Sequence, residues 1–423
     1  MSYYSDNNVK TKYIDPRVFV PGKRAVFDLD LTESGYLPNL KLAFLGLTSD
    51  TQTTYNRLLG PAAMIRSARL LDGKTVLSAL NEAQFYKAFK NINRSNADAE
   101  ARHSNVELTQ NGMTIDGSAN VVARVAMQGF ADVNGIEAAT NPTNLATIDL
   151  RDYFPILNAL PVLPTALFKN LRIELEFNAA SSNQVVNLVN TTLVQQRPLL
   201  IADCMINEDT LAKVMKMMPK EVVWHEVEHD QFVIPGAAAG ASGNDGIRQR
   251  VNIKLNGYNN KIVDELLIAK EIGNALLETT GGTDVLANGK WSSQSSYSQQ
   301  VQYRVNGRNI LPREGIIGDN ERMAFVVDTF GDCLGYPESN AYQGDTTNKT
   351  LMGINGSGQL DYMAIYLGKQ INDLQINYSR VHLTQAAGKR ATNELLIGHC
   401  YGSVRKQLMM VGNMQYIIDY QQN

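Results

Sequence analysis

An internal repeat of three sequence patterns, in the same order in each half, constrains this 423-residue chain more than any other feature. The first-half segments are residues 24–31 (RAVFDLDL), 39–47 (NLKLAFLGL) and 69–77 (RLLDGKTVL), and their second-half counterparts, in order, are 250–255 (RVNIKL), 262–269 (IVDELLIA) and 303–311 (YRVNGRNIL). In the last pair, Gly73 follows Asp and Gly307 follows Asn, and these glycines are 234 positions apart. Three matches in one order predict a duplicated domain.

Strand patterns dominate the chain. The clearest alternation lies in residues 171–177 (LRIELEF), where an apolar residue occupies every second position and charged residues lie between. Such alternation predicts an antiparallel strand with one buried face. Residues 65–71 (IRSARLL) run into Asp72-Gly73, a dipeptide typical of hairpin turns. We therefore expect an all-β protein.

Helical patterns are few. Residues 78–90 (SALNEAQFYKAFK) have helical spacing, and Ser78 is the expected N-cap residue. Residues 209–218 (DTLAKVMKMM) predict a second helix, which ends before Pro219. Residues 264–277 are compatible with either a helix or a strand.

The length of the chain also indicates two domains, because single cores stop growing at about 250–300 residues. The helix predicted over residues 209–218 is the expected link between them. We therefore expect an N-terminal arm over residues 1–17, a first domain over residues 18–218 and a second over residues 219–423.

The composition favours protein–protein contacts over nucleic-acid binding. Charged residues make up 19% of the chain, below the usual level of about a quarter. The net charge is −3 and the pI is about 6.0, so the chain lacks the basic footprint of a dedicated nucleic-acid-binding protein. We expect no sequence-specific binding of nucleic acid.

Basic residues are densest near the N-terminus. They are Lys10, Lys12, Arg17, Lys23 and Arg24. One interpretation is a solvated tail. The other is an arm that faces an enclosed genome or membrane, or that ties neighbouring subunits together.

Residues 225–229 (HEVEH) match the H-E-x-x-H pattern of zinc peptidases, in which two histidines on one helix face hold the metal. The flanking sequences, EVVW before and DQFVI after, are β-branched and aromatic, so we expect a strand instead. In a strand, residues i and i+4 lie about 13 Å apart, whereas each zinc ligand lies about 2.0–2.1 Å from the metal. We expect no metal here, and one strand face with His225, Val227 and His229.

Other signals of catalysis are weak. Cys204, Cys333 and Cys400 are far apart and odd in number, which predicts free thiols in a reducing compartment. His399 precedes Cys400, but adjacent residues of a strand point to opposite faces, so we expect no nucleophile–base pair. The sequence contains no phosphate-binding glycine motif and no G-x-S-x-G motif. We expect no catalytic residues, no cofactor and no specific small-molecule ligand.

The sequence has no targeting or membrane signal. The first twenty residues are polar, and no apolar run reaches the roughly 18–20 residues needed to span a bilayer. We expect a soluble protein made in a cytosol-like compartment. Long segments rich in Gly, Ser, Thr, Asn and Asp separate the strands and predict loops with a role of their own; they are residues 131–147, 236–247, 279–300 and 331–360.

Two stretches resemble a known family. Residues 60–74 (GPAAMIRSARLLDGK) have a Gly-Pro entry, an apolar strand and an Asp-Gly turn. Residues 148–177 (IDLRDYFPILNALPVLPTALFKNLRIELEF) have an aromatic-Pro segment, a Pro-rich crossing and the alternating strand. Together with residues 197–203 and the helix that follows, they resemble the double jelly-roll major capsid proteins of tailless DNA viruses, such as adenovirus hexons and the capsid proteins of virophages and polinton-like viruses. The resemblance is clearest over residues 18–220.

This resemblance implies two tandem eight-stranded antiparallel jelly rolls. It implies homotrimers whose six jelly rolls form a pseudo-hexagonal block, and blocks that tile an icosahedral virion shell. The expected partners are other copies of the chain and penton and minor capsid proteins, and an inner membrane is left open. The protein would then be made in the host cytoplasm and reside in the virion, with no enzymatic activity.

Two alternatives remain from the sequence. A minor or penton capsid protein usually needs only one jelly roll, and the internal repeat argues against it. A two-domain carbohydrate-binding β-sandwich protein would need clustered carboxylates and exposed tryptophans, and the chain has only Trp224 and Trp291.

Overall fold

The structure is a computed structural model. It describes residues 9–29, 32–44, 54–55, 62, 64–92, 114–115, 121–122, 146–178, 186–187, 197–205, 208–235, 248–272, 300–312, 315, 324–325, 328–329, 362–381, 396–411 and 415–421. Antiparallel strands make up most of the regular structure in these residues, as the sequence predicts. No helix in the described ranges is long and apolar enough to cross a membrane.

The first half of the chain forms a sandwich of two sheets. One sheet contains β1 (Val9–Ile14), β15 (Leu199–Met205), β4 (Gly35–Tyr36), β5 (Lys41–Phe44), β11 (Ala146–Asp149) and β12 (Leu163–Pro164). The other contains β2 (Val18–Val20), β3 (Arg24–Asp28), β13 (Leu171–Phe177), β7 (Ile65–Asp72) and β8 (Thr75–Leu80). Two small ladders join β6 (Thr54–Tyr55) to β14 (Val186–Asn187), and β9 (Thr114–Ile115) to β10 (Val121–Val122).

The second half forms a second sandwich. One sheet contains β16 (Glu221–Ile234), β23 (Leu396–Val411), β18 (Lys261–Ile272), β21 (Tyr362–Ile371) and β24 (Gln415–Tyr420). The other contains β17 (Arg248–Leu255), β22 (Leu374–Val381), β19 (Gln300–Val305) and β20 (Arg308–Asn309). The helical elements are α1 (Ala83–Ile92), η4 (Leu150–Asp152), α4 (Ile156–Ala159) and α5 (Glu208–Met217).

The two sandwiches have the same strand topology. In chain order, eight main strands are β1, β3, β5, β7, β8, β11, β13 and β15 in the first and β16 to β23 in the second. In each sandwich the first, eighth, third and sixth strands pair in that order in one sheet. The second, seventh, fourth and fifth strands pair in that order in the other. Each sandwich is therefore a jelly roll, and the prediction of two tandem eight-stranded jelly rolls is confirmed.

The repeat in the sequence corresponds to this topology. Its first pair of segments forms β3 and β17, its second pair forms β5 and β18, and its third pair forms the hairpins β7–β8 and β19–β20. Gly73 and Gly307 lie in the turns of these hairpins with φ of 61° and 78°. Residues without a Cβ adopt this left-handed conformation readily, which explains the glycine at both turns.

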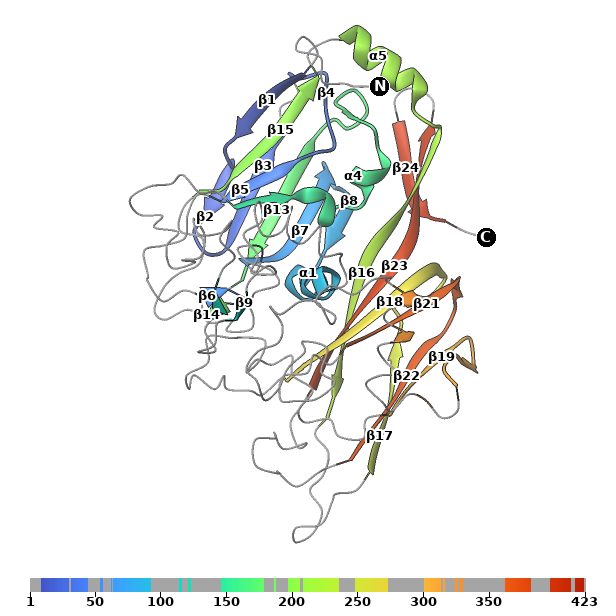
Figure 1. The fold of residues 1–423 in the computed structure, drawn as a ribbon. Coiled ribbons are helices and arrows are strands. Elements are labelled where there is room, and N and C mark those ends of the chain that lie inside the picture. Colours follow the sequence, from blue (N-terminus) through green and yellow to red (C-terminus); the bar gives the residue numbers. More distant parts are fainter. Residues whose placement is uncertain are drawn as a thin grey trace.

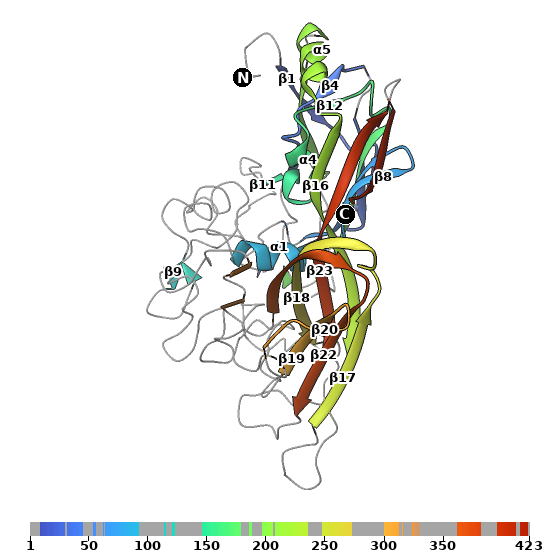
Figure 2. The same ribbon diagram turned by 90° about the vertical axis from the view of Figure 1, so that its right-hand side faces the viewer.

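The helix α5 links the two jelly rolls, close to the predicted residues 209–218. Among the described residues, every strand pairing joins strands on the same side of α5, and the domain boundary near residue 218 stays a prediction. Figures 1 and 2 show the two jelly rolls, with β16 and β23 running from the second alongside the first.

Two predictions on local structure were wrong. Ser78 does not cap a helix, because it lies in β8 and its hydroxyl is buried against the second jelly roll; α1 begins at Ala83. The N-terminal segment is not an arm over its whole length, because Val9–Ile14 pairs with β15 as the first strand of the first jelly roll. Residues 264–277, left open between helix and strand, form part of β18 as far as Ile272, and the rest lie outside the described residues.

We expect Gly73→Ala and Gly307→Ala each to lower the free energy of unfolding by about 1–2 kcal/mol, because a Cβ disfavours the left-handed conformation. No other atom lies within 4 Å of a Cβ built on either glycine, so the cost is that of the backbone alone. Chemical denaturation measures it. Lys74→Ala, an exposed change beside the first turn, is the control and should stay within about 0.5 kcal/mol of wild type. A glycine variant as stable as wild type would contradict the shared turn geometry.

Candidate functional site

The two jelly rolls are joined through a buried carboxylate. Glu226, on β16, is 1% exposed. Its Oε1 accepts hydrogen bonds from Ser78 Oγ at 2.8 Å and from the Ala79 amide at 3.1 Å, both on β8. Its Oε2 accepts one from Trp224 Nε1 at 2.8 Å. Burial raises the pKa of Glu226, against the opposing effects of the Lys406 charge and these three hydrogen bonds. The glutamate that the peptidase pattern assigns as a base is thus enclosed by the contact between the jelly rolls.

Aromatic side chains extend this contact. Phe85 of α1 stacks on His399 of β23, with ring centroids 4.4 Å apart, and Tyr86 lies 5.3 Å from Tyr401. The Tyr401 hydroxyl donates to the carbonyl of Glu82 at 2.7 Å. The hydrophobic core of the first jelly roll continues into side chains of the second, among them Val222, Trp224, Val227, Leu267, Ala364, Tyr401 and Leu408. The contact is therefore built like a domain interior.

The C-terminal strand is part of the same contact. Tyr416 of β24 donates its hydroxyl to Asp72 Oδ2 at 2.7 Å, in the turn between β7 and β8. Tyr420 donates to Glu228 Oε1 at 2.6 Å, and Lys261 and Lys406 also pair with Glu228. β24, the last described strand, thereby bonds both the first jelly roll and the middle of β16.

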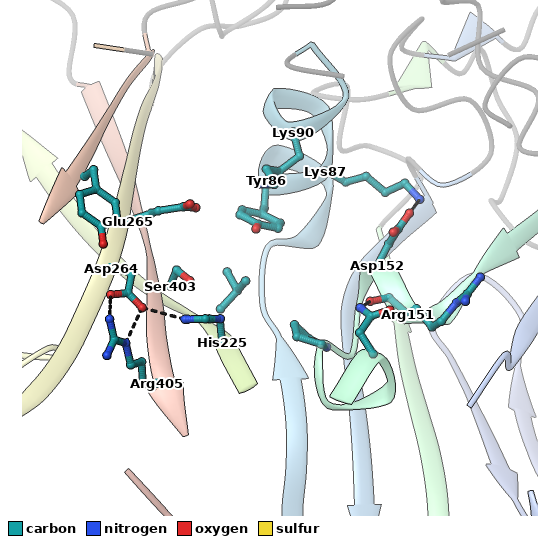
Figure 3. Close-up of a pocket in the computed structure, with 14 residues that line it drawn as sticks. Tyr86, Lys87, Lys90, Arg151, Asp152, His225, Asp264, Glu265, Ser403 and Arg405 are labelled. Atoms are coloured by element: carbon teal, nitrogen blue, oxygen red, sulfur yellow. Dashed lines mark hydrogen bonds and ion pairs between the residues drawn. The ribbon is translucent and has the colours of Figure 1, made fainter. Parts of the chain in front are cut away.

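A cleft of about 520 Å³ lies beside this contact, between the two jelly rolls (Figure 3). The first jelly roll contributes side chains from α1, η4 and α4, and the second contributes them from β16, β18, β21 and β23. The labelled residues that line it are Tyr86, Lys87, Lys90, Arg151, Asp152, His225, Asp264, Glu265, Ser403 and Arg405.

Asp264 is the most constrained group in the cleft wall. The pairing of β18 with its neighbours shifts register at this residue, and such a bulge can re-aim a side chain. Arg405 donates two hydrogen bonds to its carboxylate, at 2.7 and 2.6 Å, and His225 Nε2 lies 2.8 Å from Oδ2. Burial alone would raise the pKa of Asp264, but Arg405 and His225 hold it below its ordinary value. This wall is a fixed ionic network.

The zinc-peptidase pattern does not converge on a metal. The predicted strand is confirmed as β16, and its two histidines have different partners. His225 contacts Asp264, whereas His229 Nε2 lies 3.0 Å from His399 Nδ1. No group of three His, Cys, Asp or Glu side chains suited to a metal occurs in the part of the chain that the structure describes.

Two of the three cysteines lie among the described residues. Cys204 and Cys400 are buried and free, and burial raises their thiol pKa to about 11 and about 12. Cys400 belongs to the core of the second jelly roll, whereas His399 stacks on Phe85 of the first, so these neighbours point apart as predicted. Cys333 lies outside the described residues.

The structure separates the basic residues near the N-terminus. Lys10 and Lys12 lie on β1 in one sheet, and Lys12 pairs with Glu33. Arg17 pairs with Asp28 of the opposite sheet at 2.7 Å, Lys23 is in the turn before β3, and Arg24 begins β3. They do not form one continuous strip, and their role in contacts between subunits stays a prediction. The segments predicted as functional loops lie almost wholly outside the described residues.

The comparisons with known proteins concern the fold. No protein-family model matches the chain, and no curated protein matches it. Among solved structures, a capsid model of the virus PBCV-1 is 9% identical, with a TM-score of 0.58 and coverage of 100% of this chain and 99% of that one. The mavirus major capsid protein is 8% identical, with a TM-score of 0.56 and coverage of 99% and 91%. A chain of the Sputnik virophage is 9% identical, with a TM-score of 0.55 and coverage of 98% and 89%. The chain therefore has the double jelly-roll fold that these proteins have.

We expect Glu226→Ala to lower the free energy of unfolding by about 3 kcal/mol, because it leaves three buried donors without an acceptor. Urea denaturation followed by tryptophan fluorescence reports this, since Trp224 is one of the donors. Glu221→Ala, an exposed change on the same strand, is the matched control and should lie within about 0.5 kcal/mol of wild type. Equal losses from both variants would argue against the contact.

Acid should weaken the contact through His229. Burial, followed by the neighbouring His399, lowers the pKa of His229 to about 4 from its ordinary value of 6.5. Because the folded state holds the histidine neutral, its contribution is present above pH 6.5 and is lost as the pH falls toward 4. The loss amounts to at most about 3 kcal/mol. The free energy of unfolding, measured at a series of pH values across this range, should depend less on pH in His229→Gln than in wild type. Identical pH dependence in both proteins would contradict the assignment.

Proposed function

We propose that this chain is the major capsid protein of a tailless icosahedral DNA virus, and that its function is to assemble. The supporting observation is a double jelly-roll fold that matches viral capsid proteins over nearly the whole of both chains. The likeness leaves almost no length in this chain for a separate catalytic domain. Its work is then structural, and its place is the virion after synthesis in the host cytoplasm.

The proposed unit of assembly is a homotrimer. Three chains provide six jelly rolls, and six similar sandwiches in a ring form a block with nearly hexagonal symmetry. Such blocks tile a shell, with penton and minor capsid proteins at the remaining places. The interior-like packing between the two jelly rolls suits this role, because a tile needs a fixed angle between its halves.

The alternatives fit the observations less well. A penton or minor capsid protein usually needs one jelly roll, and this chain has two with equal topology. A carbohydrate-binding protein of the expected kind needs exposed tryptophans, and Trp224 is 3% exposed within the contact between the jelly rolls. Trp291 lies outside the described residues.

The purified chain should form trimers at micromolar concentration, with three times the 46.7 kDa mass of one chain. Native mass spectrometry measures the mass, and negative-stain electron microscopy should show compact particles with a hexagonal outline. A protein that stays monomeric at tens of micromolar, with no larger assembly, would refute the proposal.

A further inference from the structure

The jelly-roll repeat allows a residue-by-residue comparison of the two outer faces. In the first jelly roll the eighth strand pairs Cys204 with Tyr36 of β4, the short strand just before the third. In the second it pairs Val404 with Val263 of the third strand, β18, and all four residues are buried. With these pairs aligned, Ile201 corresponds to Tyr401. Tyr401 pairs with His229 of β16, and Ile201 pairs with Tyr13 of β1. Tyr13 and Ile201 are thus the first-roll counterparts of His229 and Tyr401.

The second-roll pair is covered within the chain. The residues that cover it follow β8, the fifth strand of the first jelly roll. Tyr86 lies against Tyr401, Phe85 stacks on His399 beside His229, and the Glu82 carbonyl accepts from the Tyr401 hydroxyl. Within one chain, the residues that follow the fifth strand of the first jelly roll therefore pack against the first and eighth strands of the second.

The first-roll pair is left open. Tyr13 is 69% exposed, the highest value among the large hydrophobic side chains that are exposed in the described residues. Ile201 beside it is half-buried. Lys41 of β5 is also exposed, and it pairs with Ile201 on the other side of β15. An exposed tyrosine next to aliphatic and cationic side chains is typical of the centre of a protein interface.

The second surface of the proposed contact follows the fifth strand of the second jelly roll. After β20, the fifth strand of the second jelly roll, residues 324–325 and 328–329 have helical backbone, and Thr329 Oγ1 donates to the Phe325 carbonyl at 2.7 Å. In chain order these residues follow the fifth strand of the second jelly roll, as α1 follows the fifth strand of the first. Ala324 and Asp328 are exposed there, and the Asp328 carboxylate is opposite in charge to Lys41.

We propose that the helical residues after β20 in one copy of the chain cover Tyr13 and Ile201 of the next copy. This inference rests on the proposed function, because it assigns the contact that would close the trimer. The contact is head-to-tail, so it generates a ring when the rotation closes. In Figure 1 the β1–β15 edge and the β19–β22 sheet lie on opposite flanks of the chain, as successive contacts in a ring require. Around the proposed ring, the contact between the two jelly rolls of one chain would alternate with a similar contact between jelly rolls of neighbouring chains.

The test changes each surface separately. Tyr13→Ala removes the exposed anchor, and Ala324→Arg places a long side chain on the opposing surface. Each variant should weaken every contact at least about tenfold. Because a ring of three contains three such contacts, the trimer constant should fall by about a thousandfold. Sedimentation velocity over a concentration series measures it, and circular dichroism melts confirm that the exposed changes leave the chain folded.

Matched controls separate this contact from general effects. Tyr366→Ala removes a tyrosine that is 60% exposed elsewhere, and Ala212→Arg makes the same change at an exposed helical position of α5. Both controls should keep the wild-type trimer. If either surface variant keeps it, or if the controls dissociate equally, the assigned contact is wrong while the capsid proposal stands. If wild type itself is monomeric, the proposed function fails instead.

Discussion

The structure depends on the packing of β16 and β23 against the first jelly roll. These strands extend beyond the core of their own sandwich, and their extensions complete the core of the other. Within this packing, Glu226 satisfies the hydroxyl of Ser78, the amide of Ala79 and the indole of Trp224. A buried carboxylate is tolerated only where donors surround it, so its two bonds to β8 favour one register between the jelly rolls.

This dependence explains why the cleft between the jelly rolls is fixed. Its second-roll wall is a network in which Arg405 and His225 both bond Asp264. Its first-roll wall includes Lys87, which pairs with Asp152 at 3.2 Å, and Arg151, which pairs with Asp149 at 2.5 Å. Each of these pairs lies within one jelly roll, on one wall of the cleft. The cleft is thus a consequence of the rigid contact beside it.

The contact surfaces of the two jelly rolls also bear on the proposed assembly. In the proposed assembly, each jelly roll has one contact surface on its first strand and another beside its fifth strand. The contact between the two jelly rolls of one chain uses one surface of each kind and leaves one of each kind for other copies. Exposed Tyr13 lies on one open surface, and the helical residues after β20 lie on the other. In the proposed assembly, a closed ring of copies would cover both surfaces. The proposal therefore explains both the exposed Tyr13 and the buried contact between the jelly rolls by the same pair of surfaces.

The sequence by itself determined what depends on local periodicity. Alternation predicted β13 over its whole length, Asp72-Gly73 and Asn306-Gly307 predicted equivalent hairpins, and the repeat predicted two sandwiches. It could also reject the zinc motif, because strand spacing separates the histidines. Only the tertiary structure decided that Val9–Ile14 is a sheet strand and that Ser78 belongs to β8. Val9–Ile14 takes its backbone hydrogen bonds from β15, more than a hundred residues away. Ser78 pairs with Leu70 across the β7–β8 hairpin, and its hydroxyl bonds Glu226 of the second jelly roll. A short segment with weak periodicity has no structure until a partner supplies its hydrogen bonds, and at Ser78 strand pairing prevailed over a helix N-cap pattern, which is why local patterns could not predict these two features.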